Sequence, residues 1–217
     1  MISRTNEKIV GVLFLLATAA FMAGSALIDL NLTQSDFLSH FYSNRMQVYT
    51  GLFLELINSA AVVGIAMLLF PLLKHHNESI ALGYLSSRII ESALLIAGFM
   101  SPLVLLTLSE AYIAGDGSST TIYSSIGNLL ITGQEMSFEL AMLVLGIGSL
   151  MFCYLLYRKR LIPRLLSILG IVGYAALIAS SCLVITGFDP GYMLFIPGGI
   201  FEILFPVWLI AKGFNRT

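Results

Sequence analysis

The sequence predicts an all-α, polytopic membrane protein: a bundle of six transmembrane helices with both termini in the cytoplasm. Three observations predict this fold. First, 58% of the 217 residues are apolar and 11% are charged, whereas soluble domains have about 45–50% apolar and about 25% charged residues. Second, six apolar stretches are each long enough to cross a bilayer. Third, Lys and Arg gather on one side of these stretches.

The six stretches are separated by polar breaks with loop chemistry, such as Asp189-Pro190-Gly191. A bilayer core about 30 Å thick needs about 20 apolar residues per helix. The sequence shows no strand-type alternation, so helices rather than a barrel are expected. We expect helices at residues 9–28, 48–73, 80–108, 135–157, 165–186 and 192–211, within a single membrane domain over residues 1–217.

The first apolar stretch and two connecting segments need separate interpretation. The first stretch has about 20 residues, longer than the apolar region of a signal peptide (about 7–15), so a retained helix is predicted. Residues 35–46 are short and mixed, with apolar residues partly on one helical face. They are typical of an interfacial helix on the outer surface, and packing over the mouth of the bundle is an equal alternative. Residues 114–125 are rich in Gly, Ser and Thr and predict a flexible outer loop.

Lys and Arg predict the orientation, because they are enriched in cytoplasmic loops. With the N-terminus inside, the outer side keeps one basic residue, Arg45. The inner side holds the other ten, with Arg88 only towards that side: Arg4, Lys8, Lys74, Arg88, Arg158, Lys159, Arg160, Arg164, Lys212 and Arg216. Both chain ends are therefore expected in the cytoplasm.

Ionisable side chains inside the spans are costly, which makes them candidates for function. Glu55 and Glu139 lie in two different spans, and each lies 19 residues before a basic residue at the inner end of its helix. This equal spacing predicts that the two carboxylates lie at a similar depth, near the outer edge of the bilayer core. Asn58 lies on the same helical face as Glu55. Glu135 shares the face of Glu139, and Glu202 lies near the midplane.

Arg88 and Glu91 are three residues apart in the third span, which predicts an ion pair inside the membrane. Glu55 and Glu139 outermost, Glu202 in the middle and Glu91 further inward form a ladder of four carboxylates, with Arg88 as the one cation. One interpretation is a relay for protons or cations, or an acid-lined pocket for a cationic substrate. The alternative is that neutral glutamates and the ion pair only hold the helices together.

Helix breakers point to the same region. Pro197-Gly198-Gly199 precedes Glu202 and predicts a kink or break in the sixth span, where backbone groups could face a binding site. Pro102 lacks an N–H and is expected to free the carbonyl of Gly98 in the third span.

Several chemistries are not supported by the residues present. The three histidines lie in loops, and the two cysteines, Cys153 and Cys182, have neither metal nor disulfide spacing. No metal site, cofactor or catalytic residue is therefore expected, and an enzyme is the least favoured class. A net charge of -1 indicates no nucleic-acid partner.

Three stretches together resemble a bacterial membrane family known as domain of unknown function 4386. They are Ser87-Arg88-Ile89-Ile90-Glu91, Arg160-Leu161-Ile162-Pro163-Arg164 and the segment from Phe201-Glu202 to Lys212-Gly213. The resemblance covers essentially the whole chain. It implies a six-helix unit in the bacterial cytoplasmic membrane and no particular activity.

The favoured function is to bind or transport a proton, a small cation or an amphipathic substrate through an acid-lined cavity. The alternative is a non-transporting membrane sensor or scaffold that contacts lipid or a partner protein. In that case the basic segment Arg158-Lys159-Arg160 would supply the contacts, although anionic lipid alone also explains it. The expected partners are membrane lipids and a small-molecule or cation ligand, and homo-oligomers remain open.

Overall fold

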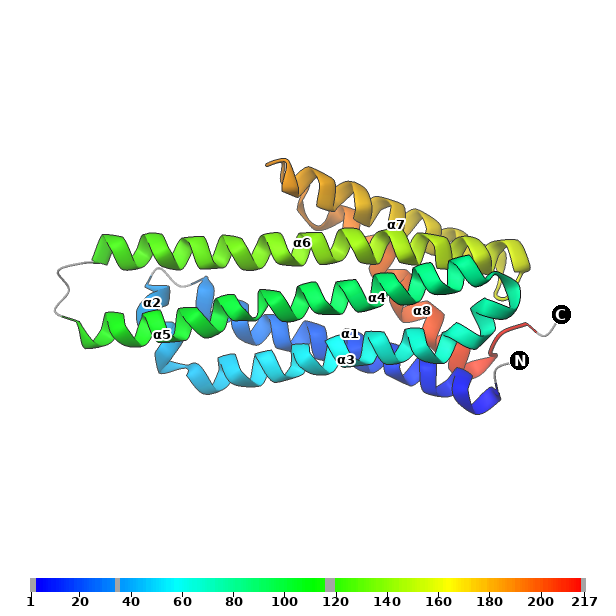
Figure 1. Ribbon diagram of the computed structural model, residues 1–217, viewed down its shortest axis with the longest axis horizontal. Helices are drawn as coiled ribbons and strands as arrows, with labels where there is room; N and C mark the ends of the chain where they lie inside the picture. The colour runs from blue at the N-terminus through cyan, green and yellow to red at the C-terminus, as the bar shows by residue number, and fades with distance from the viewer. Residues whose placement is uncertain (1–2, 34–35, 116–119, 216–217) are drawn as a thin grey trace.

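The computed structural model describes residues 3–33, 36–115 and 120–215, and in this part of the chain it contains helices and no strand. Six helical stretches are long and apolar enough to cross a membrane, so the prediction of an all-helical, six-span protein is confirmed. The helices, shown in Figure 1, are α1 (Arg4–Leu32), α2 (Phe37–Ser43), α3 (Arg45–His76), α4 (Glu78–Gly98), α5 (Met100–Ala114), α6 (Thr120–Lys159), α7 (Arg164–Ile185), the 3₁₀ turn η1 (Gly191–Phe195) and α8 (Ile196–Ala211).

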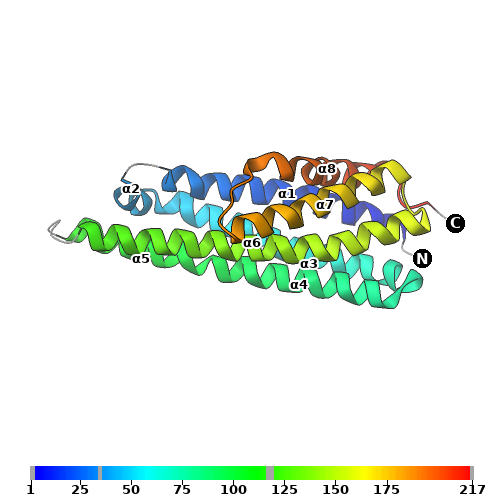
Figure 2. The ribbon, with the colours of Figure 1, turned by 90° about the horizontal axis from the view of Figure 1, so that it is seen from above.

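The spanning helices form a closed ring. In spatial order the neighbours are α1, α3, α4, α6, α7 and α8, and α8 packs against α1 to complete the circle. Figure 2 shows α8 beside both α1 and α7. A ring of six helices leaves room for side chains from every helix to meet at its centre.

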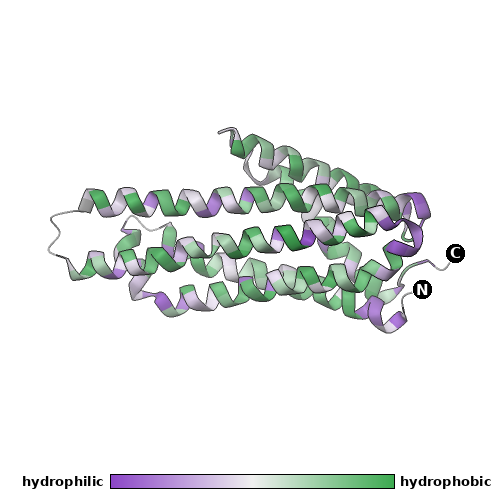
Figure 3. Ribbon diagram, in the orientation of Figure 1, coloured by the Kyte–Doolittle hydropathy of each residue, from purple (hydrophilic) through white to green (hydrophobic). Residues whose placement is uncertain are grey.

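Both termini lie at one end of the bundle, which we call the terminal end (Figure 1). The ends of α1, α3, α6, α7 and α8 place most of the Lys and Arg residues there, and Figure 3 shows hydrophilic residues gathered at this end. Arg216, expected on the same side, lies outside the described residues. We call the opposite end the loop end.

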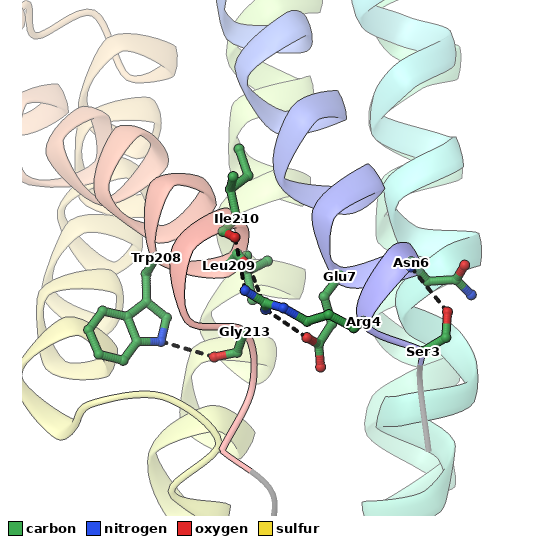
Figure 4. A network of polar contacts seen from close by, with 8 residues as sticks. All are labelled: Ser3, Arg4, Asn6, Glu7, Trp208, Leu209, Ile210 and Gly213. Carbon is green, nitrogen blue, oxygen red and sulfur yellow. Dashed lines mark hydrogen bonds and ion pairs between the residues drawn. The ribbon is translucent and has the colours of Figure 1, made fainter.

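The terminal end is held together by a network around Arg4 (Figure 4). Arg4 Nη1 and Nη2 donate hydrogen bonds to the carbonyl oxygens of Leu209 and Ile210, each at 2.9 Å, and Nη1 also lies 2.9 Å from the Glu7 carboxylate. The last carbonyls of a helix have no partner within the helix. Arg4 therefore caps α8 from the first turn of α1. Gly213 continues the chain with φ +78°, in the left-handed region that glycine adopts freely.

The loop end extends further than the hydropathy pattern predicts. At 1.5 Å per residue α6 is about 60 Å long, whereas α7 is about 33 Å long, and Figure 1 shows α5 and α6 running well past α7. Residues 120–125, expected to belong to a flexible loop, are the first turns of α6, and residues 116–119 lie outside the described part. Helical packing explains the difference: the ring of Tyr123 meets that of Tyr112 edge-on at 5.8 Å.

The helix α2 packs against α5. Leu38 and Phe41 are buried, and the Ser109 hydroxyl donates to the Leu38 carbonyl while it accepts from the backbone N–H of Tyr42. Residue 35 lies outside the described part, and the two arrangements expected for residues 35–46, on the outer surface or over the mouth of the bundle, stay predictions. A small second core forms here among α1, α2, α3 and α5.

The third span contains a local irregularity. α4 ends at Gly98 and α5 begins at Met100, but Phe99 between them keeps helical φ and ψ, so the expected helix 80–108 lies within one helical stretch, Glu78–Ala114. Pro102 lies in the first turn of α5 and has no N–H to offer the Gly98 carbonyl. This is the carbonyl that the sequence predicts to be free.

Candidate functional site

The centre of the ring contains a cavity of about 250 Å³. All six spanning stretches contribute to its wall, and most of the lining side chains are apolar. The aromatic part of the lining consists of Phe14, Phe21, Phe138, Phe195 and Tyr174. The polar part consists of Thr18, Asn58, Arg88, Glu91 and Glu202, together with the Tyr174 hydroxyl. The cavity is thus an apolar chamber with a small polar cluster.

The first polar contact joins two turns of α4. Arg88 Nη1 lies 2.8 Å from Glu91 Oε2, and both side chains are only 3% exposed. Arg88 Nε donates to the Tyr84 hydroxyl at 3.3 Å, and Tyr84 in turn stacks on Phe152 with 4.8 Å between ring centroids. A buried guanidinium needs such partners, because an unpaired charge in a low-dielectric interior is very costly. The expected pair of Arg88 and Glu91 is therefore in contact in the structure.

The second polar contact joins α7 and α8. The Tyr174 hydroxyl donates to Glu202 Oε1 at 3.2 Å. Counted from the helix ends at the terminal end, Arg88, Tyr174 and Glu202 each lie about 14–15 Å into the bundle. Since all three line one cavity, one guanidinium faces two carboxylates, those of Glu91 and Glu202, near the middle of a bilayer core about 30 Å thick.

Asn58 adds an amide to the wall from α3. Its side chain is 8% exposed and lines the cavity. An amide carries two N–H donors and a carbonyl oxygen that accepts hydrogen bonds. At the cavity wall it can offer these groups to a molecule inside the cavity.

The outer glutamates are not part of the cavity wall. Glu135 is exposed on α6. Glu139 is buried, and its Oε2 has no hydrogen-bond partner among the described residues. Glu55 is half-buried beside α1, where a Cβ on Gly24 would lie 2.9 Å from its Cγ. The structure therefore brings Glu202, Glu91, Arg88 and Asn58 together and leaves Glu55, Glu135 and Glu139 outside.

The predicted helix break falls at the edge of the cavity. The 3₁₀ turn η1 passes directly into α8, and Pro197 occupies the first turn of α8, a position that tolerates its missing N–H. Gly198 and Gly199 line the cavity. A Cβ on Gly173 of α7 would lie 2.6 Å from the Gly198 backbone, so these glycines permit close helix contact. Pro102 is buried in α5 and does not line the cavity.

Sequence reasoning missed the two tyrosines that complete the cluster. Tyr84 precedes Arg88 by one helical turn, and this spacing could have identified it as a partner. Tyr174 has no such local signal, because its partner Glu202 is on another helix, 28 residues away. Glu7, which pairs with Arg4, is almost fully buried and was also missed.

Comparison with known proteins gives one match. Residues 9–213 match the model of a family described as a domain of unknown function (DUF4386). No curated protein and no solved structure matches the chain.

Proposed function

The chain belongs to the DUF4386 family, and we propose that its helix bundle binds a small amphipathic molecule with an apolar body and a cationic head group. The observation that carries this proposal is the position of Glu202, on the wall of an otherwise largely apolar cavity. Ligand sites combine apolar walls with a few polar groups that fix orientation. Here the few polar groups share the wall of the cavity with apolar and aromatic side chains.

The charges of the cluster favour a cation over an anion. Arg88 is already paired with Glu91, so an anionic ligand would have to compete with a carboxylate 2.8 Å from the guanidinium. Glu202 accepts one hydrogen bond, from Tyr174. A protonated amine would supply the positive charge and the N–H donors that the second carboxylate, that of Glu202, lacks in this environment.

An inorganic metal ion fits the cavity less well. Hard cations such as Ca²⁺ take six to eight oxygen ligands. Among the described residues, no group of three or more His, Cys, Asp or Glu side chains is arranged to hold a metal. Phenyl rings on several walls instead offer apolar contact and cation–π stabilisation to an organic amine.

The size of the cavity limits the ligand. Its volume is about 250 Å³. It lies just below the usual range of ligand pockets, about 300–1,000 Å³. The enclosed part of the ligand is therefore compact, with about the bulk of a short alkylamine.

The test compares three probes with one eight-carbon chain: octylamine, octanol and octanoate. Thermal unfolding of the wild type is measured in lipid nanodiscs with each probe, alongside Glu202→Gln, which keeps shape and hydrogen bonding but cannot ionise. We expect octylamine to raise Tm most in the wild type and to lose this advantage in Glu202→Gln. Equal shifts for all three probes, or an unchanged amine preference in Glu202→Gln, would overturn the proposal. Glu135→Gln, an exposed acid outside the cavity, is the matched control.

A second candidate role is a membrane sensor, and the packing between the cavity and the terminal end supports it. Buried aromatic residues that do not line the cavity fill the ring of helices there: Phe205 stacks on Phe201, with 5.2 Å between ring centroids, and meets Phe152 edge-on. A ligand held in the cavity can be sensed without crossing the membrane, whereas transport to the terminal end requires these rings to move apart. Saturable, Glu202-dependent flux of octylamine into proteoliposomes would identify transport, and binding without such flux would identify a sensor.

A further inference from the structure

We infer that the ligand enters the cavity sideways from the lipid phase, through an opening between α1 and α8, and is therefore a molecule dissolved in the membrane. This inference rests on the proposed function for the identity of the ligand as an amphipathic amine. The opening itself is inferred from separate contacts.

The first observation is the exposure of the lining residues. Met22, on α1, is 64% exposed, and Gly199, on α8, is also exposed, although both line the cavity. Lining residues on α4 and α7, such as Arg88 and Tyr174, are buried. The cavity thus reaches the protein surface where α1 and α8 face one another.

The second observation is that α8 packs on a different neighbour at each of its two ends. Near the terminal end it packs tightly on α1, where a Cβ on Gly11 would lie 2.8 Å from the Pro206 carbonyl oxygen. Near its start it packs instead on α7, where Gly198 meets Gly173. A Cβ on Gly199 would meet nothing within 4 Å. α8 therefore diverges from α1 towards the loop end, and the gap widens at Gly199.

The third observation is that packed aromatic rings lie towards both ends of the bundle axis. On the loop side, Phe21 of α1 stacks on Phe138 of α6, with 5.8 Å between centroids and 4° between the ring planes. On the terminal side, beyond the lining residues, the buried ring of Phe205 meets that of Phe152 edge-on, with 5.6 Å between centroids. These rings narrow the route along the bundle axis, which favours entry through the side opening.

The depth of the opening places it in hydrocarbon. Measured from the helix ends at the terminal end, Gly199 lies about 18 Å and Met22 about 27 Å into the bundle. Both depths fall within a core about 30 Å thick. The neighbouring surface of α8 is apolar and exposed, with Ile196 57%, Ile200 45% and Ile203 52% exposed. A molecule that reaches this opening comes from the acyl-chain region.

The test uses nitroxide spin labels on single cysteines in a Cys182→Ser background, since Cys182 is the exposed native thiol and Cys153 is buried. Labels are placed at Gly199→Cys in the opening, at Ile203→Cys on the exposed face one turn along α8, and at Asp189→Cys in the connection before η1. Collision rates with oxygen, which concentrates in lipid, and with a neutral nickel chelate, which stays in water, are measured in proteoliposomes.

We expect the Gly199 label to resemble the Ile203 label, with an oxygen-to-nickel collision ratio at least tenfold above that at Asp189. A ratio at Gly199 like that at Asp189 would show a water-filled route and overturn the inference. Added octylamine should lower oxygen collisions at Gly199 and leave those at Ile203 unchanged. If the first result holds and octylamine has no effect, the side opening stands and the proposed amine ligand is wrong.

Discussion

The hydroxyl of Tyr174 on α7 lies 3.2 Å from Oε1 of Glu202 on α8, and both side chains line the central cavity. The pair links two helices that meet the chamber from the same side. It also fixes the direction in which the carboxylate presents its second oxygen. The position of the proposed binding group thus depends on a tyrosine 28 residues away in the chain.

Removing this hydroxyl should weaken binding without unfolding the protein. A hydrogen bond to a charged group contributes about 1.5–3 kcal/mol, so Tyr174→Phe should lower octylamine affinity roughly tenfold or more. The measurement is calorimetric titration in nanodiscs. Tyr192→Phe, at an exposed position in η1, is the control and should bind as the wild type does. Equal affinity in Tyr174→Phe would show that Glu202 is positioned by packing alone.

Arg88 should be far more important for stability than Arg45. Removing one partner of a buried ion pair strands the other charge and typically costs about 3–5 kcal/mol. Arg88 is 3% exposed and paired with Glu91, whereas the groups around Arg45 are exposed. Arg88→Ala should therefore lower Tm clearly more than Arg45→Ala. The double variant Arg88→Met with Glu91→Gln should recover part of the loss, because no charge is then stranded. Similar small losses for both single variants would refute the buried pair.

The membrane fold could be predicted from composition because hydrocarbon tolerates few structures. About 20 apolar residues suffice to identify a span, whatever the helix contacts. The extension at the loop end could not be found this way. Residues 120–134 mix polar and apolar side chains, and their helix is stabilised by distant contacts, such as Phe37 against Gly127, where a Cβ would lie 2.9 Å from the Phe37 ring.

The sequence predicts the depth of the site residues, but not the direction in which their side chains point. Distances to the helix ends place Glu202 near the midplane, and spacing pairs Arg88 with Glu91. The equal depth of Glu55 and Glu139 carries no information about helix rotation. In the structure Asn58, three residues after Glu55, lines the cavity while Glu55 does not. Which face a helix turns inward depends on packing with its neighbours, which a single sequence does not display.

The orientation predicted from Lys and Arg can be tested with single cysteines in a Cys182→Ser background. Ser79 lies at the terminal end, in the first turn of α4, and Asp189 lies before η1 at the other end of α7. Because basic loops stay in the cytoplasm, Asp189→Cys should react with an impermeant maleimide added to intact bacterial cells. Ser79→Cys should react only after the cells are opened. The reverse pattern would place the termini outside.

Arg4 should stabilise the bundle through its cap on α8. Its planar guanidinium reaches two carbonyl oxygens and the Glu7 carboxylate at once, which a lysine ammonium cannot reproduce in the same geometry. Arg4→Ala leaves Glu7 buried without its partner and should cost about 1–3 kcal/mol. The Tm of Arg4→Lys should lie between those of the wild type and Arg4→Ala. Lys8→Ala, at an exposed position, should change Tm little. Thermal unfolding in one detergent ranks the three variants, and an Arg4→Ala Tm equal to that of Lys8→Ala would contradict the cap.

Gly173, which contacts α8, and Gly199, which makes no such contact, should respond in opposite ways to the same added methyl group. A Cβ on Gly173 would lie 2.6 Å from the backbone of Gly198, which cannot move aside as a flexible side chain would. Gly173→Ala should therefore force the helices apart and cost about 1–3 kcal/mol. A Cβ on Gly199 meets nothing within 4 Å, so Gly199→Ala should be neutral or slightly stabilising, since alanine favours helix. Unfolding midpoints in nanodiscs measure both. If Gly173→Ala were as stable as Gly199→Ala, the close packing that tilts α8 away from α1 would be absent, and the side opening would lose its structural cause.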